Sequence, residues 1–311
     1  MGLYDFTFYD LINRNAVSFK EKDAWFEVDD NRTLTFSQYK EKVDCLAYGL
    51  QKAGITKGDR IGVVGKNSLE YFLLYGAAAA LGAIMLPINW RLSADEVGYN
   101  LNDCEPKLLF ADPEFQETVE GLKEKLQSVE KYFNLGPGGG KFSDFNPLMD
   151  NQADFEPAEV STDDGFVIIH TAAVAGKPRG ALLSHGNVLC ADMHVDYLCG
   201  LTSQDVHLNV LPLFHVGGLF LATSTFHAGA LNVNVSKFDA EKAVKLIAVK
   251  KVSVLIEFPP ILASILDQHE KTGTDISSLK IVAGLETPET IEKYQKVTGG
   301  IFYVLYGQTE T

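Results

Sequence analysis

The sequence predicts an α/β protein in which mostly parallel sheets are flanked by helices. One observation is that short apolar runs alternate with longer segments whose apolar residues recur every three or four positions. The other is length. Because 311 residues are more than usually fold around one small hydrophobic core, we expect two packed subdomains. Strands and helices that alternate in this way favour βαβ units with right-handed crossovers.

The first half of the chain contains a predicted helix over residues 34–54. Its apolar stripe consists of Phe36, Tyr39, Val43, Leu46, Ala47 and Leu50. We expect Ser37 to cap this helix and Gly54 to end it. Strands are predicted at 61–64, near Ile84 and at 108–111, and a capping box formed by Ser93 and Glu96 should open another helix.

Residues 71–88 carry no charge and approach the length of a membrane-spanning helix. Their centre, residues 76–82, is mostly Ala and Gly and is therefore only weakly apolar. Pro87 and the apolar run before it indicate that a helix ends and a strand begins here. We predict a buried helix whose small side chains let it lie close to a sheet.

A Gly-rich run at 136–140 and the acidic stretch that follows it interrupt the alternation. We therefore predict one subdomain over 1–155 and a second over 156–311. The second half resumes with strands predicted at 166–169, 206–211, 231–235, 252–256, 281–283 and 301–305. Helices are predicted at 185–198, 239–251 and 288–297, the last opened by Thr287 ahead of a proline.

The composition excludes several classes of protein. Hydrophobic residues make up 46% of the chain and charged residues 22%, as in folded soluble proteins. A formal net charge of −14 argues against a nucleic-acid or anionic-membrane partner. The four cysteines form no zinc-site spacing, so we expect free buried thiols in a reducing compartment. The N-terminus has no secretory signal, and we expect a cytoplasmic protein.

The stretch from Thr171 to Gly180 follows a predicted strand and combines small residues with Lys177 and Arg179. Small side chains let backbone N–H groups approach an anion, and the two cations would neutralise it. It is not a Walker A loop, because that pattern needs Gly at 171 and Ser or Thr at 178. On spacing alone, a phosphate-binding loop and a simple turn between two strands both remain open.

Two further stretches follow in order, residues 211–219 with the sequence LPLFHVGGL and residues 306–310 with the sequence YGQTE. Together with the loop at 171–180, they resemble the adenylate-forming superfamily of acyl-CoA synthetases, luciferases and peptide-synthetase adenylation domains. The resemblance covers essentially the whole chain. It implies that an acid is activated by ATP to an acyl-AMP, with release of pyrophosphate, and is then transferred to a thiol, usually that of coenzyme A.

The resemblance implies roles for individual residues. Glu310 matches the family's Mg²⁺-binding carboxylate, a hard oxygen ligand that suits an ion bridging phosphates. Thr309 matches the hydroxyl on the AMP phosphate, Tyr306 the ring beside adenine, and Gly307 a close turn. Gly284 resembles the adenine-side glycine only loosely.

The resemblance places His215 at the mouth of the acyl pocket, with Val216, Gly217 and Gly218 in its wall and Phe258 in the acyl-site turn. Amino-acid-activating relatives usually carry an Asp in this region to pair the amine. This chain has Phe214 and His215 there, so the resemblance implies a plain fatty or aryl acid.

The phosphate loop departs from the family pattern. Thr171, Gly176 and Lys177 are kept, and Arg179 stands at the position of the family's second Lys. Alanines and a valine stand where hydroxyl and Gly residues are usual, namely at Ala172, Ala173, Val174 and Ala175. Backbone N–H groups, including those of Ala172 and Ala173, survive these changes, whereas side-chain hydroxyls do not. An alternative is therefore a nucleotide- or acyl-binding homologue whose adenylation is weakened or lost.

The chain shows no counterpart of the family's ribose-binding Asp, hinge or C-terminal lid domain with its catalytic Lys. The resemblance therefore implies an incomplete AMP-binding domain, in which residues 1–311 alone are inactive while the full-length parent is the enzyme. An oligomer is compatible with the sequence. A third alternative, a nicotinamide-dependent dehydrogenase, is disfavoured, because no G-x-G-x-x-G opens a helix after an early strand.

Overall fold

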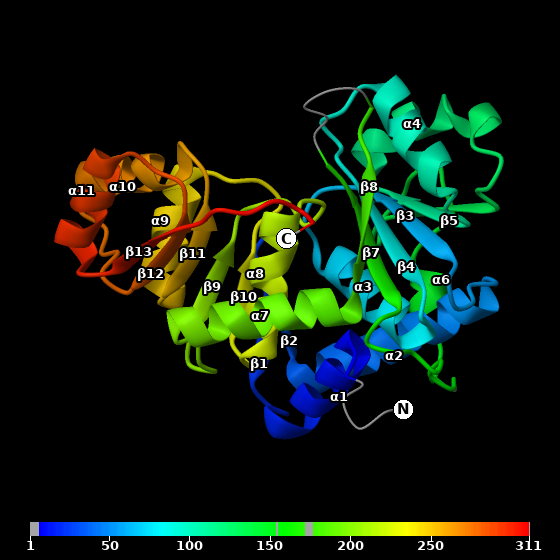
Figure 1. Cartoon of the computed structure of the whole chain (residues 1–311), viewed down its shortest axis with the longest axis horizontal. Helices are drawn as coiled ribbons and strands as arrows, with labels where there is room; N and C mark the ends of the chain where they lie inside the picture. Colours follow the sequence, from blue (N-terminus) through cyan, green and yellow to red (C-terminus); the bar gives the residue numbers. More distant parts are fainter. Residues whose placement is uncertain (1–5, 154, 172–176, 311) are drawn as a thin grey trace.

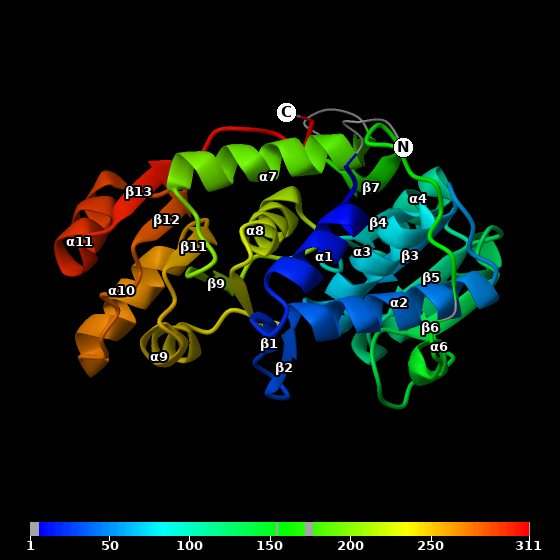
Figure 2. The same ribbon diagram turned by 90° about the horizontal axis from the view of Figure 1, so that it is seen from below.

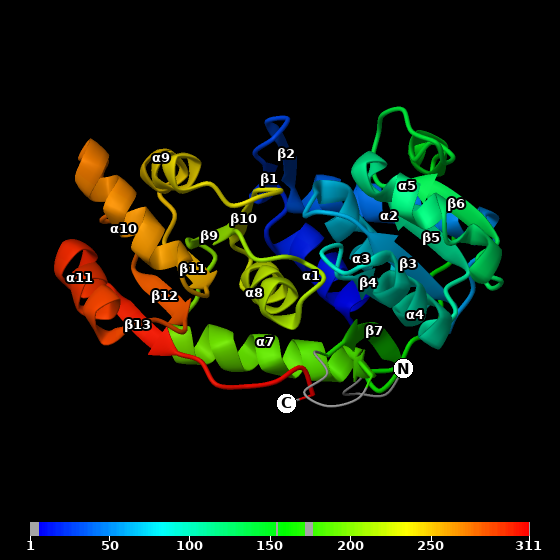
Figure 3. The same ribbon diagram turned by 90° about the horizontal axis from the view of Figure 1, so that it is seen from above.

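A computed structural model describes residues 6–153, 155–171 and 177–310. Alternating strands and helices build two sheets, one of six strands and one of seven (Figure 1). Each sheet carries helices on both of its faces, as the views from below and above show (Figures 2 and 3). The predicted α/β class with mostly parallel sheets is confirmed.

The six-stranded sheet has the order β6-β5-β3-β4-β7-β8. Its neighbours are parallel except for the antiparallel pair β7 and β8. The strands are β3 (Arg60–Val64), β4 (Ile84–Ile88), β5 (Leu108–Ala111), β6 (Lys131–Asn134), β7 (Gly165–His170) and β8 (Gly180–Ser184). The helices α2 (Phe36–Lys52) and α3 (Leu69–Leu81) lie on one face, and α4 (Ala94–Cys104) lies on the other (Figure 2).

Helix α3 is buried along its whole length, which confirms the prediction of a buried helix followed by a strand. Its small residues allow close packing, because a Cβ at Gly76 would lie 2.5 Å from Cγ2 of Val43 on α2. Among the described residues, no helix combines the length and the apolarity that crossing a membrane requires.

The seven-stranded sheet has the order β13-β12-β11-β9-β10-β1-β2, and only β1 and β2 pair antiparallel. Its strands are β1 (Asp23–Glu27), β2 (Arg32–Thr35), β9 (Val206–Asn209), β10 (Leu231–Asn234), β11 (Val254–Glu257), β12 (Ile281–Gly284) and β13 (Ile301–Val304). One face carries α7 (His185–Cys199) and α8 (Val216–His227). The other carries α9 (Ala240–Lys250), α10 (Ile261–Thr272) and α11 (Pro288–Thr298) (Figure 3).

Strand pairing crosses the predicted subdomain boundary at 155–156. Strands β7 and β8 follow the boundary in the sequence but belong to the six-stranded sheet, whereas β1 and β2 precede it and join the seven-stranded sheet. The division at this position therefore does not separate the two sheets. The division into subdomains 1–155 and 156–311 remains a prediction.

Local capping explains where several helices begin. Ser93 with Glu96 forms the predicted capping box of α4, and Thr287 caps α11 ahead of Pro288. Helix α2 begins at Phe36, so the expected cap at Ser37 is wrong. Thr35 accepts from the backbone N–H of Gln38 instead, and the residues before it form β2.

Several elements were not predicted, among them α1 (Phe8–Ser18), β1, β2, α8 and α10. Helix α8 lacks an amphipathic stripe because apolar and small residues surround it on nearly all sides. The cysteines are free as expected, but the expectation that they are buried is wrong. Cys190 is exposed, and Cys45, Cys104 and Cys199 are half-buried.

The largest apolar core joins the two sheets. Helix α1 contacts α2 and α3, and Asn15 donates from its side chain to the Phe226 carbonyl of α8 over 2.5 Å. The Phe226 ring lies within 6.0 Å, centroid to centroid, of four other aromatic rings, those of Phe8, Phe36, Tyr39 and Phe72. These rings come from α1, α2, α3 and α8, so this cluster fixes how the two halves meet.

Phe226→Ala should destabilise the protein by about 3–5 kcal/mol, because it leaves a cavity among four buried rings. Val249 on α9 is 76% exposed, so Val249→Ala serves as the control and should change stability by less than about 0.5 kcal/mol. Urea unfolding followed by circular dichroism measures both. Equal effects of the two substitutions would contradict the role given to the aromatic cluster.

Candidate functional site

The carboxyl ends of four parallel strands bring separate predicted stretches to one sheet edge. Glu257, the last residue of β11, pairs with Gly284 of β12, which in turn pairs with Val304 of β13. The His215 loop follows β9, the neighbour of β11 in the same sheet. Ligands of α/β proteins bind at such an edge, so His215, Phe258, Gly284 and Tyr306 leave strands that end side by side.

His215 caps α8. Its Nδ1 accepts a hydrogen bond from the backbone N–H of Gly217 at 3.1 Å, so the neutral ring carries its proton on Nε2. Burial of part of the ring, with the nearby Arg91 cation, lowers the pKa of His215. The residue is otherwise exposed and meets the Phe258 ring edge to face at 6.5 Å. A neutral, exposed N–H donor at a helix N-terminus suits recognition of a carboxylate.

Asn67, in the connection between β3 and α3, fixes the loop that carries His215. Its side-chain nitrogen donates to the Leu211 carbonyl at 2.8 Å, and its oxygen accepts from the Leu213 N–H at 2.7 Å. The hydroxyl of Tyr75 donates to the Leu213 carbonyl at 3.0 Å. Sequence reasoning missed both residues. The available signal was a polar Asn at the end of a strand of a parallel sheet.

The predicted pocket residues after His215 differ in what they contact. A Cβ at Gly218 would lie 2.2 Å from the Pro212 carbonyl oxygen, so glycine is needed there for packing. A Cβ at Gly217 would lie 3.4 Å from His215 Nδ1 and 3.6 Å from the Phe258 ring, which are ordinary contacts. Val216 packs partly buried against the main core. Gly217 and Phe258 therefore border the exposed side of His215, whereas Gly218 shapes the turn beneath it.

A second group beside His215 was also missed. The Arg91 guanidinium lies over the Trp90 ring at 4.8 Å and over the Phe214 ring at 5.8 Å. Both aromatic rings meet edge to face, at 6.4 Å between centroids. Trp90 and Arg91 follow β4, so an element of the six-stranded sheet places a cation next to the His215 loop.

Gly284 needs its glycine. Its φ is +151°, and a Cβ there would lie 2.0 Å from the Glu257 carbonyl oxygen. Its own carbonyl accepts from the Leu305 N–H at 2.9 Å, which ties the end of β12 to the start of the segment 305–310. Gly284 thus lies next to the predicted adenine-side residues, although the sequence match there is loose.

The segment after β13 runs back toward the six-stranded sheet (Figures 1 and 2). Tyr306 is fully exposed, Gly307 and Glu310 are exposed, and Thr309 is partly buried. These side chains are therefore open to a ligand. No hydrogen bond or ion pair among the described residues joins Glu310 to Lys177, Arg179 or His215.

The phosphate-loop candidate connects β7 with the antiparallel strand β8, so its described ends form a strand-to-strand connection. The backbone N–H of Thr171 donates to the Arg179 carbonyl at 3.0 Å. Lys177 lies 5.1 Å above the Tyr99 ring of α4, whose hydroxyl donates to the Pro178 carbonyl at 3.3 Å. The two predicted cations, Lys177 and Arg179, are both exposed to solvent. The predicted residues Ala172, Ala173 and Gly176 lie outside the described residues.

The fold and these stretches together define an α/β protein with loops at the carboxyl ends of parallel strands, where proteins of this class bind ligands. Comparison with known proteins names the family. The profile described as "AMP-binding enzyme" matches residues 12–311. The chain belongs to the AMP-binding enzyme family.

Two curated proteins of known name match most of this chain. The chain is 30% identical over 303 residues to an indoleacetate–CoA ligase of Aromatoleum aromaticum, covering 96% of this chain and 57% of the relative. It is 30% identical over 290 residues to the fatty acid–[acyl-carrier-protein] ligase ScoC of Streptomyces coeruleorubidus, covering 91% and 54%. The chain thus spans about half the length of these curated relatives.

Solved structures agree with the fold. A protein of Rhodopseudomonas palustris described as a long-chain-fatty-acid CoA ligase matches with a TM-score of 0.92 and 40% identity, covering 99% of this chain and 77% of that one. A long-chain-fatty-acid–CoA ligase of Archaeoglobus fulgidus matches with a TM-score of 0.89 and 26% identity, covering 99% and 65%.

The capping role of His215 leads to a stability prediction. His215→Ala removes the acceptor for the Gly217 N–H and should cost about 0.5–2 kcal/mol, whereas His215→Asn keeps a good N-cap and should cost less. Burial lowers the folded-state pKa of His215, so its contribution is full above the ordinary value of 6.5 and is lost as pH falls through the lowered pKa. The wild type should therefore lose stability relative to His215→Asn between pH 8 and pH 5.

Urea unfolding of the three proteins at both pH values measures these differences. If His215→Ala and His215→Asn were equally stable at pH 8, the ring would not act as the cap.

Proposed function

We propose that the protein containing this chain activates a carboxylic acid with ATP. The carboxylate attacks the α-phosphate, which gives acyl-AMP and releases pyrophosphate. The thiol of coenzyme A then takes the acyl group, loses its proton to solvent and releases AMP. The observation that carries the proposal is the family membership of residues 12–311, with the His215 loop and segment 306–310 leaving the same end of one parallel sheet, after β9 and β13. The names of the relatives, CoA ligases and a carrier-protein ligase, support it.

We assign the nucleotide to the strand ends of β12 and β13 and to the loop at 171–179. Lys177 and Arg179 supply positive charge for the phosphates, and the backbone around Gly176, Ala172 and Ala173 supplies N–H donors. Exposed Tyr306 offers a ring for adenine next to Gly284 and Gly307, and Thr309 offers a hydroxyl to the AMP phosphate.

We assign Mg²⁺ to Glu310, whose exposed carboxylate is a hard oxygen donor of the kind this ion binds together with phosphate oxygens. When bound, the ion would neutralise charge on the phosphates. Glu310 would bring a negative charge for the ion, whereas Lys177 and Arg179 would bring positive charge for the phosphates. The donor type fits the ion.

The acid itself is assigned to His215. The Nε2 proton points away from the helix cap and can donate to the carboxylate, while Arg91 nearby adds positive charge. Phe258 and the turn at Val216, Gly217 and Gly218 border this position. A fatty or aryl acid fits best, because Phe214 and His215 present an aromatic and a neutral polar group where an amino acid would need an acidic partner.

The proposal predicts acid-dependent exchange of pyrophosphate into ATP by the full-length protein. A panel of fatty and aryl acids should reveal at least one substrate, and Glu310→Gln should lower the exchange rate by roughly 100-fold or more, since it removes a charged metal ligand. Glu289 on α11 is exposed and outside the site, so Glu289→Gln should keep full activity. No exchange with any acid would overturn the assigned activity.

His215→Asn separates recognition from stability. It keeps the cap of α8 but removes the Nε2 donor, so it should raise the KM for the acid by roughly 10- to 100-fold, as for loss of a hydrogen bond to a charged group. The KM for ATP should stay nearly unchanged. Steady-state kinetics with both substrates varied provide the measurement, and an equal rise in both KM values would argue against a direct contact with the acid.

A second candidate is a nucleotide- or acyl-binding homologue with weakened or lost adenylation. The sequence Ala172-Ala-Val-Ala175 favours it, because this part of the loop carries no hydroxyl. Replacing Val174 by Thr and Ala175 by Ser should then raise ATP affinity sharply in calorimetry. An unchanged affinity would count against a damaged loop.

We further propose that residues 1–311 alone form little acyl-AMP even where they bind nucleotide, because the curated relatives are nearly twice as long. Single-turnover acyl-AMP formation by this segment tests the point, and efficient turnover would contradict it. The division into subdomains 1–155 and 156–311 and a cytoplasmic location remain part of the same proposal.

A further inference from the structure

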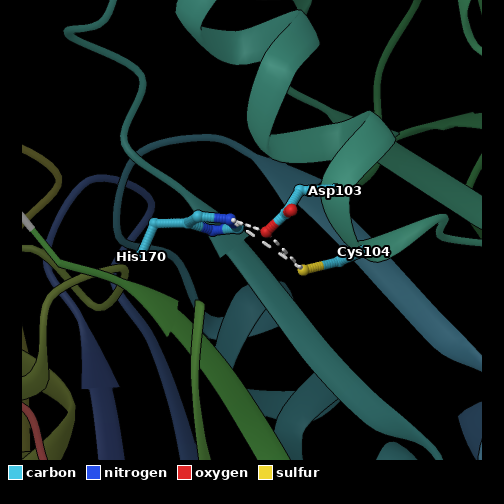
Figure 4. Close-up of side chains that lie close together, drawn as sticks. All are labelled: Asp103, Cys104 and His170. Carbon is cyan, nitrogen blue, oxygen red and sulfur yellow. Dashed lines mark hydrogen bonds and ion pairs between the residues drawn. The ribbon is translucent and has the colours of Figure 1, made fainter. Parts of the chain in front are cut away.

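A cluster of three potential metal ligands lies at the base of the 171–179 loop, outside the residues assigned to substrate. Asp103 and Cys104 end helix α4, and His170 ends strand β7. Their ligand atoms point toward one another (Figure 4) and all lie within 4.8 Å. His170 Nε2 is 3.2 Å from Asp103 Oδ2, and Cys104 Sγ is 3.9 Å from each of these two atoms.

These spacings are close to those of a tetrahedral zinc site. With metal–ligand bonds of about 2.0–2.3 Å, two ligand atoms around Zn²⁺ lie roughly 3.3–3.5 Å apart. The nitrogen and oxygen already match, and the thiol must move by a few tenths of an ångström. A thiolate, an imidazole and a carboxylate form a donor set that zinc prefers. Ionised Asp103 and Cys104 together carry two negative charges, which a divalent ion balances.

Strand β8 and the Arg60 side chain lie next to the cluster. Gly180 of β8 pairs with His170, and a Cβ at Gly180 would lie 3.4 Å from Cys104 Sγ and 3.6 Å from His170 Cε1. The Arg60 guanidinium donates to the carbonyls of Cys104 and Glu105 at 2.7 and 2.8 Å, which fixes the end of α4. The His170 side chain is only 5% exposed and that of Asp103 is 40% exposed, so solvent reaches the cluster from the Asp103 side.

The same three residue types also occur in cysteine nucleophile triads, but this geometry differs. In such a triad the carboxylate binds one ring nitrogen and the thiol the other. Here Asp103 and Cys104 both face Nε2 of His170, and Nδ1 is buried without a partner among the described residues. One nitrogen facing both other groups is the arrangement that a shared ion requires.

We propose that Asp103, Cys104 and His170 bind one Zn²⁺ or a similar thiophilic divalent ion, with water in the fourth position. Binding replaces the thiol proton, which passes to solvent, by a bond from sulfur to the metal. Because His170 directly precedes Thr171, the ion ties the end of α4 to the start of the loop at 171–179. This assignment does not depend on the proposed acid activation.

Cobalt provides the test because it occupies zinc sites and reports a bound thiolate. The full-length protein, stripped of metal with a chelator, should bind one Co²⁺ per cluster with a thiolate-to-cobalt absorption band in the near ultraviolet, and Zn²⁺ should abolish the band. Cys104→Ser and His170→Gln should remove the band. Cys190→Ser is the matched control, because Cys190 is exposed and outside the cluster, and it should leave the band unchanged.

A fold-preserving variant keeps the test decisive. Asp103→Asn removes the charge of one ligand on the solvent side of the cluster, and it should weaken Co²⁺ binding by at least roughly tenfold while leaving the circular dichroism spectrum intact. Zn²⁺ should raise the Tm of the wild type and not that of Cys104→Ser. The proposal is overturned if folded wild-type protein shows no band, or if the band persists in folded Cys104→Ser or His170→Gln.

Discussion

The buried amide of Asn67 is the interaction on which the candidate site depends. It is 5% exposed and bonds to both the Leu211 carbonyl and the Leu213 N–H. Leaving such buried backbone groups unpaired costs about 1–3 kcal/mol each, so the loop has a strong preference for this one conformation. Asn67 follows a strand of the six-stranded sheet, while the loop belongs to the seven-stranded sheet. The Asn67 side chain thus helps to hold the His215 loop of one sheet against the other.

The His215 side chain has both a structural role and a proposed chemical role. Its Nδ1 is committed to the first turn of α8, which fixes the tautomer and leaves the proton on the exposed Nε2. The helix is in turn buried between the sheets, with Phe226 in the aromatic cluster that joins them. Helix α4 has a comparable role on the other side of the site. Tyr99 contacts the loop at Pro178, and the end of α4 faces His170.

Much of the architecture and the order of the site stretches could be predicted from the sequence. Apolar stripes such as that of residues 36–50 and caps such as Ser93 and Thr287 depend on neighbours three or four positions away, and they were found. The stretches at 171–180, 211–219 and 306–310 were recognised by their order along the chain. Elements without a local period, such as α8, were not found, because burial on nearly all sides removes the amphipathic pattern.

The sequence alone determined the strand–helix alternation, the net negative charge and the identity of the residues that resemble a nucleotide- and acid-binding site. The tertiary structure decided which residues lie close enough to act together. Strands β7 and β8 join the six-stranded sheet rather than the seven-stranded sheet. The side chains of Asn67, Arg91 and Tyr99 contact loops that are distant from them in the sequence. Asp103, Cys104 and His170 likewise meet only through the packing of α4 against the end of β7. Hydrogen bonds and contacts between distant segments leave no periodic trace in a sequence, whereas helix caps and apolar stripes are set by residues a few positions apart.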